Sequence, residues 1–387
     1  MGSTGSIDVL VIGGGAAGVS AARTALDRGA TVALVSESAG ATALTSGWIA
    51  AGETGFDREA FTWLEAVGLR PLGAYAFATV TGAFASGISG LASLLDITDL
   101  PDGALGVVDM VAGSDWSAAL VAESLDPIVQ RKVRILDAGR DVPRSADTAN
   151  VARALDTEGL LDALAGALAD RAGGCGALLF PPVLGFTRDD VVSRLATRLG
   201  VVVGEAAGGM LDPTALRLAR AIDRALPSRV ERIRGRARIE FDHAKPTVHV
   251  DDRTLSPRAV VLATGGLAAG GIVFDGDLFE PCVDAPVWLD ASSSARLATR
   301  SAARGLDPAP LFTPDASGRA PATRAGVRVA PDQSILGLDG AQPLSPALFA
   351  AGAVVAGGGA VYGHSLAEAL SSGHRAGISA ARFALGR

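Results

Sequence analysis

A glycine-rich stretch near the start of the chain has the G-x-G-x-x-G spacing of a phosphate-binding turn, carried by Gly13, Gly15 and Gly18. An uninterrupted apolar run, residues 9–12, precedes it, as expected for a strand buried on both faces. Residues 16–28 follow as an Ala-rich segment, and a helix beginning at Ala16 would direct its free amides and dipole at a phosphate. A second apolar run, residues 31–35, completes a β-α-β unit. The pattern predicts a nucleotide or flavin site.

The residue after the second apolar run bears on how a ribose could be held. In dinucleotide-binding folds, an acidic residue about 20 residues after the glycines accepts a hydrogen bond from a ribose hydroxyl. Here Ser36 ends the second predicted strand and Glu37 comes next. Two interpretations stay open. Either Glu37 holds the ribose from a shifted position, or an adenosine ribose is held weakly or is absent.

Histidine and arginine side chains are the candidates for catalysis. Removing a hydride from a secondary alcohol requires a base near the hydroxyl, and a cation for any phosphate. His364 directly precedes the last predicted helix and is the candidate base, and Arg324 is the candidate cation. Arg324 belongs to an arginine group with Arg296, Arg300 and Arg328, for which a solvated surface is the structural alternative. The other histidines, His243, His249 and His374, are predicted to be structural.

Several further elements must position these residues. Residues 258–263 predict a buried strand that ends in Thr264 and Gly265, and residues 348–351 predict another that ends at Gly352. A final helix is expected over 365–384, and an exposed hairpin over 237–241 and 247–250.

The residue pattern changes between residues 50 and 215. There the sequence predicts loops over 99–106 and 138–150, and a strand over 177–180. Helices are expected over 151–171 (amphipathic, interrupted near Gly159), 189–199 and 212–226, the last N-capped by Asp212 with Pro213 at its first position.

Composition excludes several classes of protein. The chain has 387 residues and a formal net charge of −7, which argues against nucleic acid as the main partner. It has two cysteines, far apart and without a C-x-x-C, so a disulfide framework, an iron–sulfur cluster and a cysteine zinc site are unsupported, and no metal is predicted. No apolar run reaches 18 residues and the N-terminus lacks a signal pattern, so we expect a cytoplasmic protein without a membrane span.

The order of these elements resembles the fumarate reductase/succinate dehydrogenase flavoprotein superfamily (FAD-binding type 2). The resemblance rests on the glycine turn, on residues 258–266 and on residues 348–377. It implies a Rossmann-like (GR2-type) α/β flavin-binding domain with an inserted α+β cap domain. It also implies a non-covalent flavin, FAD or FMN, because residues 41–52 contain no histidine to attach one. The implied cofactor residues are Gly13, Gly15, Ala16, Gly18, Ser36, Glu37, Thr45, Ser46, Gly47, Thr264, Gly265, Gly352, Ser365 and Leu366. Ser36 and Ala353 stand where the superfamily usually has acidic residues.

A narrower resemblance extends into the insertion. Residues 45–47, 150–164, 177–186, 262–273 and 280–281 look like the B subunit of anaerobic glycerol-3-phosphate dehydrogenase, a family that binds FMN and shares both departures. This implies oxidation of glycerol 3-phosphate to dihydroxyacetone phosphate. Electrons would pass to quinone through a catalytic flavoprotein subunit and a membrane-associated iron–sulfur subunit, which would make this chain peripheral to the inner face of the membrane.

Two alternatives stay open. The segment Gly363 to Leu366 is more similar to the wider superfamily, which favours a stand-alone fumarate-reductase-like or 3-ketosteroid-dehydrogenase-like FAD oxidoreductase. The two missing acidic residues favour a non-catalytic scaffold subunit with a degenerate flavin site. In each case we expect residues 1–50 and 215–387 to form a discontinuous flavin-binding domain and residues 51–214 to form the inserted cap or substrate domain.

Overall fold

We analysed a computed structural model of the chain. It describes residues 6–37, 40–50, 56–110, 116–139, 142, 145, 147–242, 245–289, 296–297, 308–314, 320–357 and 364–387. The chain divides into two compact units. The first comprises Met1–Thr42, Gly52–Trp63 and Ile222–Arg387, and the second comprises Ala43–Ala51 and Leu64–Ala221. Among the described residues, no helix combines the length and the apolar composition needed to cross a membrane.

The first unit is built on a five-stranded parallel sheet with the order β11-β2-β1-β15-β21. Its strands are β1 (Val9–Ile12), β2 (Val32–Ser36), β11 (Glu231–Arg234), β15 (Ala259–Leu262) and β21 (Leu348–Ala350). β1 and β15 are buried along their whole length, which explains why both are uninterrupted apolar runs in the sequence. The predicted β-α-β unit is confirmed, and the strand predictions over 258–263 and 348–351 are confirmed within one residue at each end.

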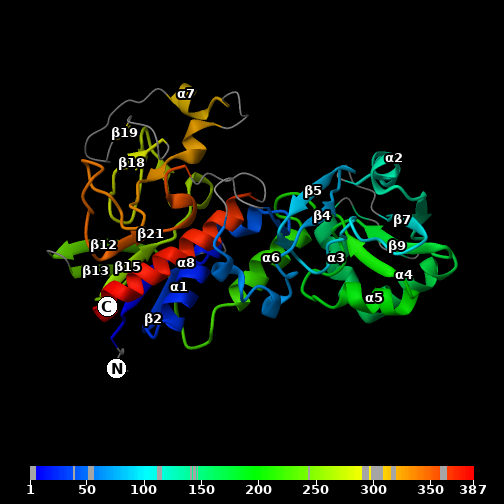
Figure 1. The fold of residues 1–387 in the computed structure, drawn as a ribbon, viewed down its shortest axis with the longest axis horizontal. Coiled ribbons are helices and arrows are strands. Elements are labelled where there is room, and N and C mark those ends of the chain that lie inside the picture. The colour runs from blue at the N-terminus through cyan, green and yellow to red at the C-terminus, as the bar shows by residue number, and fades with distance from the viewer. Residues whose placement is uncertain are drawn as a thin grey trace. The chain divides into compact units, whose positions relative to one another are not determined.

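Two helices, α1 (Ala16–Asp27) and α8 (His364–Leu385), lie side by side against this sheet (Figure 1). Glycines allow the close approach, because a Cβ at Gly373 would lie 2.3 Å from the Ala17 carbonyl oxygen and one at Gly377 would lie 2.5 Å from that of Ala21. The Ser20 hydroxyl donates to the Leu370 carbonyl across the contact at 2.7 Å. The helix pair is therefore packed closely enough to hold the N-terminus of α1 in a fixed position.

Smaller elements complete the first unit. They are the sheet β12 (Ala237–Asp242), β13 (Lys245–Val250) and β14 (Arg253–Leu255), the pair β16 (Val273–Phe274) and β17 (Leu278–Phe279), the sheet β18 (Val287–Trp288), β19 (Arg296–Leu297) and β20 (Gly326–Val327), the helix α7 (Pro308–Phe312), and the 3₁₀ turns at Arg58–Phe61, Leu267–Ala269, Pro321–Arg324 and Gly352–Val354. The antiparallel pairing of β12 with β13 confirms the predicted hairpin.

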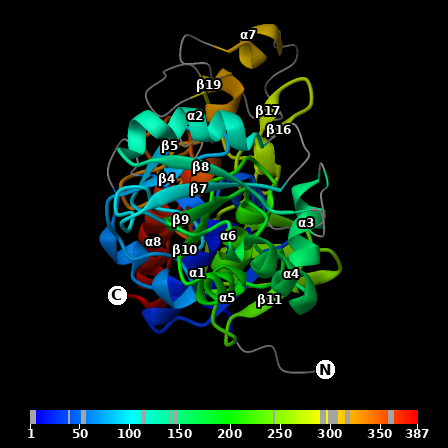
Figure 2. The same cartoon turned by 90° about the vertical axis from the view of Figure 1, so that its right-hand side faces the viewer.

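The second unit has its own four-stranded sheet with the order β10-β9-β7-β8, and every pair in it is parallel. The strands are β7 (Ala104–Asp109), β8 (Val133–Asp137), β9 (Cys175–Phe180) and β10 (Val202–Glu205). The helices are α2 (Ala118–Val129), α3 (Thr148–Leu155), α4 (Glu158–Ala169), α5 (Val191–Leu199) and α6 (Pro213–Arg224). α2 lies on one side of the strands, and α4 and α5 lie on the other (Figure 2). The sequence predicted an α+β insertion, whereas this alternation of parallel strands and helices is the pattern of an α/β unit.

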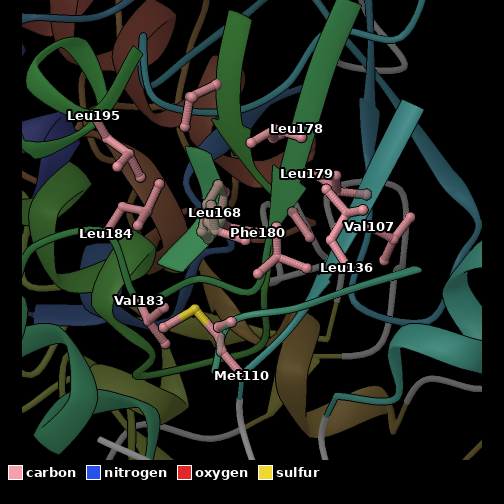
Figure 3. Close-up of a cluster of buried hydrophobic side chains, with 14 of the residues drawn as sticks. Val107, Met110, Leu136, Leu168, Leu178, Leu179, Phe180, Val183, Leu184 and Leu195 are labelled. Atoms are coloured by element: carbon pink, nitrogen blue, oxygen red, sulfur yellow. The ribbon is translucent and has the colours of Figure 1, made fainter. Parts of the chain in front are cut away.

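Short antiparallel pairs also belong to the second unit. They are β3 (Trp48–Ile49) with β6 (Ser89–Gly90) and β4 (Tyr75–Ala78) with β5 (Phe84–Gly87), and 3₁₀ turns lie at Gly40–Leu44 and Glu65–Val67. The main core lies around β7, β8 and β9, where Val107, Leu136 and Leu178 pack with Phe180 and Met110 (Figure 3).

One prediction for the second unit is wrong in part. Residues 99–106 were expected to be a loop, but β7 begins at Ala104. Gly106 lies inside this strand, where the Leu178 and Leu136 side chains occupy the space that its Cβ would need, at 2.6 and 2.7 Å. The interrupted helix expected over 151–171 is confirmed as two helices, and the interruption falls at Asp156, three residues before Gly159. The Asp156 carboxylate accepts from the amides of Phe186 and Thr187 at 3.0 and 2.9 Å.

Candidate functional site

The glycine turn after β1 is held tightly by the chain around it. Gly13 has φ +121°, and a Cβ there would lie 2.0 Å from the Ala263 carbonyl oxygen. A Cβ at Gly18 would lie 1.8 Å from the Gly13 carbonyl oxygen. These two glycines are therefore required by the fold itself, because the turn, α1 and the end of β15 meet without room for a side chain.

Gly15 has a different environment. It is the N-cap of α1 with φ −76°, which any residue can adopt. A Cβ there would approach only the Thr42 hydroxyl, at 3.3 Å. The Thr42 hydroxyl would have to shift by a few tenths of an ångström to admit a Cβ, so packing restricts this position far less than Gly13 or Gly18. The missing side chain leaves the backbone open to a ligand.

The N-terminus of α1 offers amides to an anion. Its N-cap residue, Gly15, has no side chain to cap it, and no acidic residue lies in its first turn. The Ala16 amide donates to the Thr42 hydroxyl at 2.9 Å, and the Val19 amide makes the first intrahelical bond, to Gly15, also at 2.9 Å. The amides of Ala17 and Gly18 lie between these two and so face out of the helix. Thr42 was not among the predicted residues, and the only signal for it in the sequence was a hydroxyl residue shortly after the second strand.

Two further turns meet the glycine turn at the carboxyl end of the sheet. After β15 the chain passes through Thr264 and Gly265, and Gly265 has φ +83°. The Thr264 hydroxyl oxygen is buried and has no hydrogen-bond partner in the described part of the chain. After β21 the chain turns at Gly352, with φ +75°, where a Cβ would lie 2.7 Å from the Ala17 side chain. The structure thus brings Gly13, Gly18, Thr264 and Gly352 together, as predicted for a ligand at the carboxyl ends of parallel strands.

This cradle fits the phosphate and ribityl end of a flavin. The α1 amides can donate to phosphate oxygens, and the buried Thr264 hydroxyl requires a partner that the described residues do not supply. The clearance at Gly15 lets a ligand reach the backbone. The donor set is neutral, so the helix dipole and the amides would stabilise the negative charge.

The end of β2 is organised differently from the predicted ribose site. Ser36 ends the strand directly beside Arg234 of β11. The Glu37 carboxylate accepts from Arg236 Nε at 2.9 Å, and both side chains are exposed. The hydrogen bond from Arg236 and the charges of Arg236 and Arg234 hold the pKa of Glu37 below its usual range, against a smaller opposing effect of desolvation. Glu37 therefore already has a cationic partner.

Thr45, Ser46 and Gly47 belong to the second unit. Thr45 and Ser46 are buried, the Ser46 carbonyl accepts from the Thr214 hydroxyl at 3.5 Å, and the Gly47 carbonyl accepts from the Leu91 amide at 2.9 Å. Their role at the cofactor stays a prediction.

The candidates at the C-terminal end of the chain are described only in part. α8 begins at His364, as the sequence indicated within one residue, but the side chains of His364 and Ser365 lie outside the described residues. Leu366 is buried. Arg324 ends a 3₁₀ turn, and its carbonyl accepts from the Gly357 amide at 2.9 Å, beside the segment that follows Gly352.

The structure also describes only some of the remaining histidines and arginines. His374 is buried between α1 and α8, with Nδ1 2.9 Å from the Thr24 hydroxyl, which fits its predicted structural role. His249 lies in β13, with Nδ1 3.3 Å from the Thr254 hydroxyl. His243, Arg300 and the side chain of Arg296 lie outside the described residues.

Comparison with known proteins indicates a flavin cofactor. Residues 8–67 match the family described as "FAD binding domain". This segment contains β1, the glycine turn, α1 and β2. No curated protein matches the chain at a significant level.

Solved structures with similar folds include several oxidoreductases. The 3-ketosteroid delta1-dehydrogenase from Sterolibacterium denitrificans is 13% identical, covering 99% of this chain and 100% of that one, with a TM-score of 0.39. The open conformation of a flavocytochrome c3 fumarate reductase is 14% identical, covering 99% and 79%, also with a TM-score of 0.39. Mycobacterium smegmatis Sdh1 is 16% identical, covering 99% and 69%, with a TM-score of 0.36. Identities and TM-scores this low carry no argument about activity.

Proposed function

We propose that this protein is a flavin-dependent oxidoreductase subunit similar to the B subunit of anaerobic glycerol-3-phosphate dehydrogenase. The glycine cradle carries the flavin part of the proposal, and the sequence resemblance across both units supports the subunit identity. The proposed reaction removes two electrons and two protons from glycerol 3-phosphate and yields dihydroxyacetone phosphate. The proposed partners are a catalytic flavoprotein subunit and a membrane-associated iron–sulfur subunit that deliver the electrons to quinone.

A bound flavin would supply the acceptor for these two electrons. The chain's own residues would bind and orient it. The amides of Ala17 and Gly18 would hold phosphate oxygens at the N-terminus of α1, and the Thr264 hydroxyl would bond to the cofactor from the end of β15. In the same proposal, His364 accepts the hydroxyl proton of the substrate and Arg324 pairs with its phosphate.

The identity of the flavin is proposed from the sequence resemblance. An FAD would place an adenosine ribose at the end of β2, where Arg236 uses one carboxylate oxygen of Glu37 and the other oxygen is left to accept a ribose hydroxyl. An FMN has no such ribose, and the glycerol-3-phosphate dehydrogenase family that the chain resembles binds FMN. We therefore propose FMN as the preferred flavin, with FAD as the alternative that would favour a stand-alone fumarate-reductase-like enzyme.

The test begins with the purified protein. Denaturation releases a non-covalent flavin, which chromatography identifies as FMN or FAD. Turnover of glycerol 3-phosphate with a dye acceptor is then measured for the chain alone and together with candidate partner subunits. Activity only in the complex supports the subunit, and activity of the isolated chain supports the stand-alone enzyme. Failure to bind either flavin would overturn both and favour a scaffold subunit.

A further inference from the structure

A tryptophan and an arginine of the first unit form an unusual pair. Trp288 ends β18 and lies opposite Gly326 of the antiparallel strand β20, and Arg328 follows that strand. The Arg328 guanidinium carbon lies 3.8 Å from the centroid of the Trp288 ring, so the planar group stacks on the indole.

Both side chains carry buried donors without acceptors. Trp288 is 5% exposed, and its indole Nε1 is buried with no hydrogen-bond partner among the residues described. The Nε of Arg328 is likewise buried and has no hydrogen-bond partner among the described residues. Arg328 also forms no ion pair within the described ranges. An indole N–H only donates, and a guanidinium has five donors and no acceptor. A buried donor left unpaired is unfavourable, so this pair requires an acceptor.

Other stacked arginines in the chain have an acceptor on at least one terminal guanidinium nitrogen, although the Nε of Arg70 is also buried and unpartnered. Arg23 lies 5.7 Å from the centroid of Trp63, but its Nη1 donates to the Ala225 carbonyl at 2.9 Å. Arg70 lies over Tyr75, and its Nη2 donates to the Leu94 carbonyl at 2.7 Å. Stacking alone therefore does not leave an arginine without acceptors.

Asp339, an acidic residue next to Gly340, does not serve Arg328 either. Gly340 lies beside Arg328 Nη1, at 3.7 Å from the position of a Cβ, and Asp339 precedes it. The Asp339 carboxylate accepts from the amides of Ala341 and Gln342 at 3.0 and 3.1 Å. It is thus used to close its own turn.

We propose that Arg328 and Trp288 bind an oxyanion, either a phosphate or a carboxylate group. Every unpartnered buried atom of the pair is a donor, and one of the two side chains carries a permanent positive charge, so the chemistry selects an anionic acceptor. In taking this anion to be the phosphate of the substrate, shared with Arg324, the inference rests on the proposed function.

The test is a titration of the purified full chain, with its flavin where one is bound, with inorganic phosphate and separately with acetate. Calorimetry measures the affinity, and the difference in tryptophan fluorescence between the unaltered chain and Trp288→Phe reports the environment of Trp288, one of four tryptophans. We expect saturable binding, with the tighter of the two anions identifying the group. Arg328→Gln and Trp288→Phe should each weaken it roughly tenfold or more, and Arg328→Lys several-fold, because a lysine lacks the planar fork.

The matched control is Arg23→Gln, which alters a stacked arginine whose donors are already used. It should leave anion affinity unchanged. Thermal unfolding of every variant identifies one that fails to fold, and protection of Arg328 from phenylglyoxal by phosphate tests the site in the unaltered chain. No saturable binding, or equal binding by Arg328→Gln, would overturn the proposal. If the protein binds the anion but binds no flavin, the proposed function is refuted and this site stands. If it binds flavin but no anion, this site is refuted and the proposed function stands.

Discussion

Alanine at Gly13 and alanine at Gly15 should have opposite consequences, although both change the same turn. At Gly13 the new Cβ would lie 2.0 Å from the Ala263 carbonyl oxygen, and φ is +121°. Backbone strain of about 1–3 kcal/mol and overpacking of about 1–3 kcal/mol sum to about 2–6 kcal/mol of lost stability. That is a large part of the roughly 5–15 kcal/mol that stabilises a folded domain.

Gly15→Ala should spare the fold. Its φ of −76° suits alanine, and the nearest atom to the new Cβ is the Thr42 hydroxyl at 3.3 Å. Alanine is a poorer N-cap than glycine, which costs about 1 kcal/mol or less. The methyl group would, however, occupy the surface from which a phosphate approaches the α1 amides. Loss of one charge-assisted hydrogen bond lowers flavin affinity by about 1.5–3 kcal/mol, which is tenfold or more.

The assay compares the two variants with the unaltered chain. Urea denaturation reports stability, and titration of the apoprotein with FMN and with FAD reports affinity. We expect Gly13→Ala to lower the denaturation midpoint and Gly15→Ala to lower only the affinity. A Gly15→Ala variant that binds flavin normally would refute the conclusion that Gly15 faces the cofactor. A Gly13→Ala variant of unchanged stability would refute the packing argument.

Three further outcomes are expected. Thr264→Val removes a buried hydroxyl that has no partner among the described residues, so stability should hold while flavin affinity falls by about 0.5–1.5 kcal/mol, measured by the same titration. Arg217→Met would leave the buried Glu205 carboxylate without its ion-pair partner and should destabilise the protein by about 3–5 kcal/mol in urea, whereas the double variant with Glu205→Leu should recover most of the loss. Burial alone would raise the pKa of Asp156. Hydrogen bonds from Thr187 and from neighbouring amides lower this pKa by a larger amount, so it lies below the usual range. The stability from this carboxylate is present above its unfolded pKa and is lost as the pH falls through its folded pKa. Below about pH 4, the stability of the unaltered chain in thermal unfolding should therefore fall more steeply than that of Asp156→Asn.

The sequence predicted the first unit well because its signals are local. Residues 9–12 and 258–263 are apolar runs bounded by glycines, and their burial in a parallel sheet requires that pattern. A local signal also worked in the second unit, where Asp212 and Pro213 mark the start of α6 and the Asp212 carboxylate accepts from the Ala215 amide at 2.9 Å. Such features depend only on neighbours in the chain.

The second unit was less predictable because its signals are tertiary. Pro101 and Gly103 predicted a loop over 99–106, and Gly103 does precede β7, where a Cβ would lie 2.6 Å from the Gly176 amide nitrogen. Gly106, however, lies inside β7, where the Leu178 and Leu136 side chains leave no room for a Cβ. In the first unit, the pairing of Thr42 with the Ala16 amide likewise joins residues 26 positions apart and leaves no local pattern.

The flavin cradle and the proposed anion site are joined by one short run of chain. Gly352 makes the turn at the cradle, and Val355, three residues later, forms a parallel bridge with Val327 of β20. The Ala356 amide donates to the Val327 carbonyl at 2.8 Å. A Cβ at Gly326 would lie 2.3 Å from the Val354 carbonyl oxygen, so the two segments pack without room for a side chain. Backbone bonds therefore fix the strand before Arg328 relative to the turn at Gly352. An anion held by Arg328 would then lie at a set distance from a flavin in the cradle, as the proposed oxidation of a charged substrate requires.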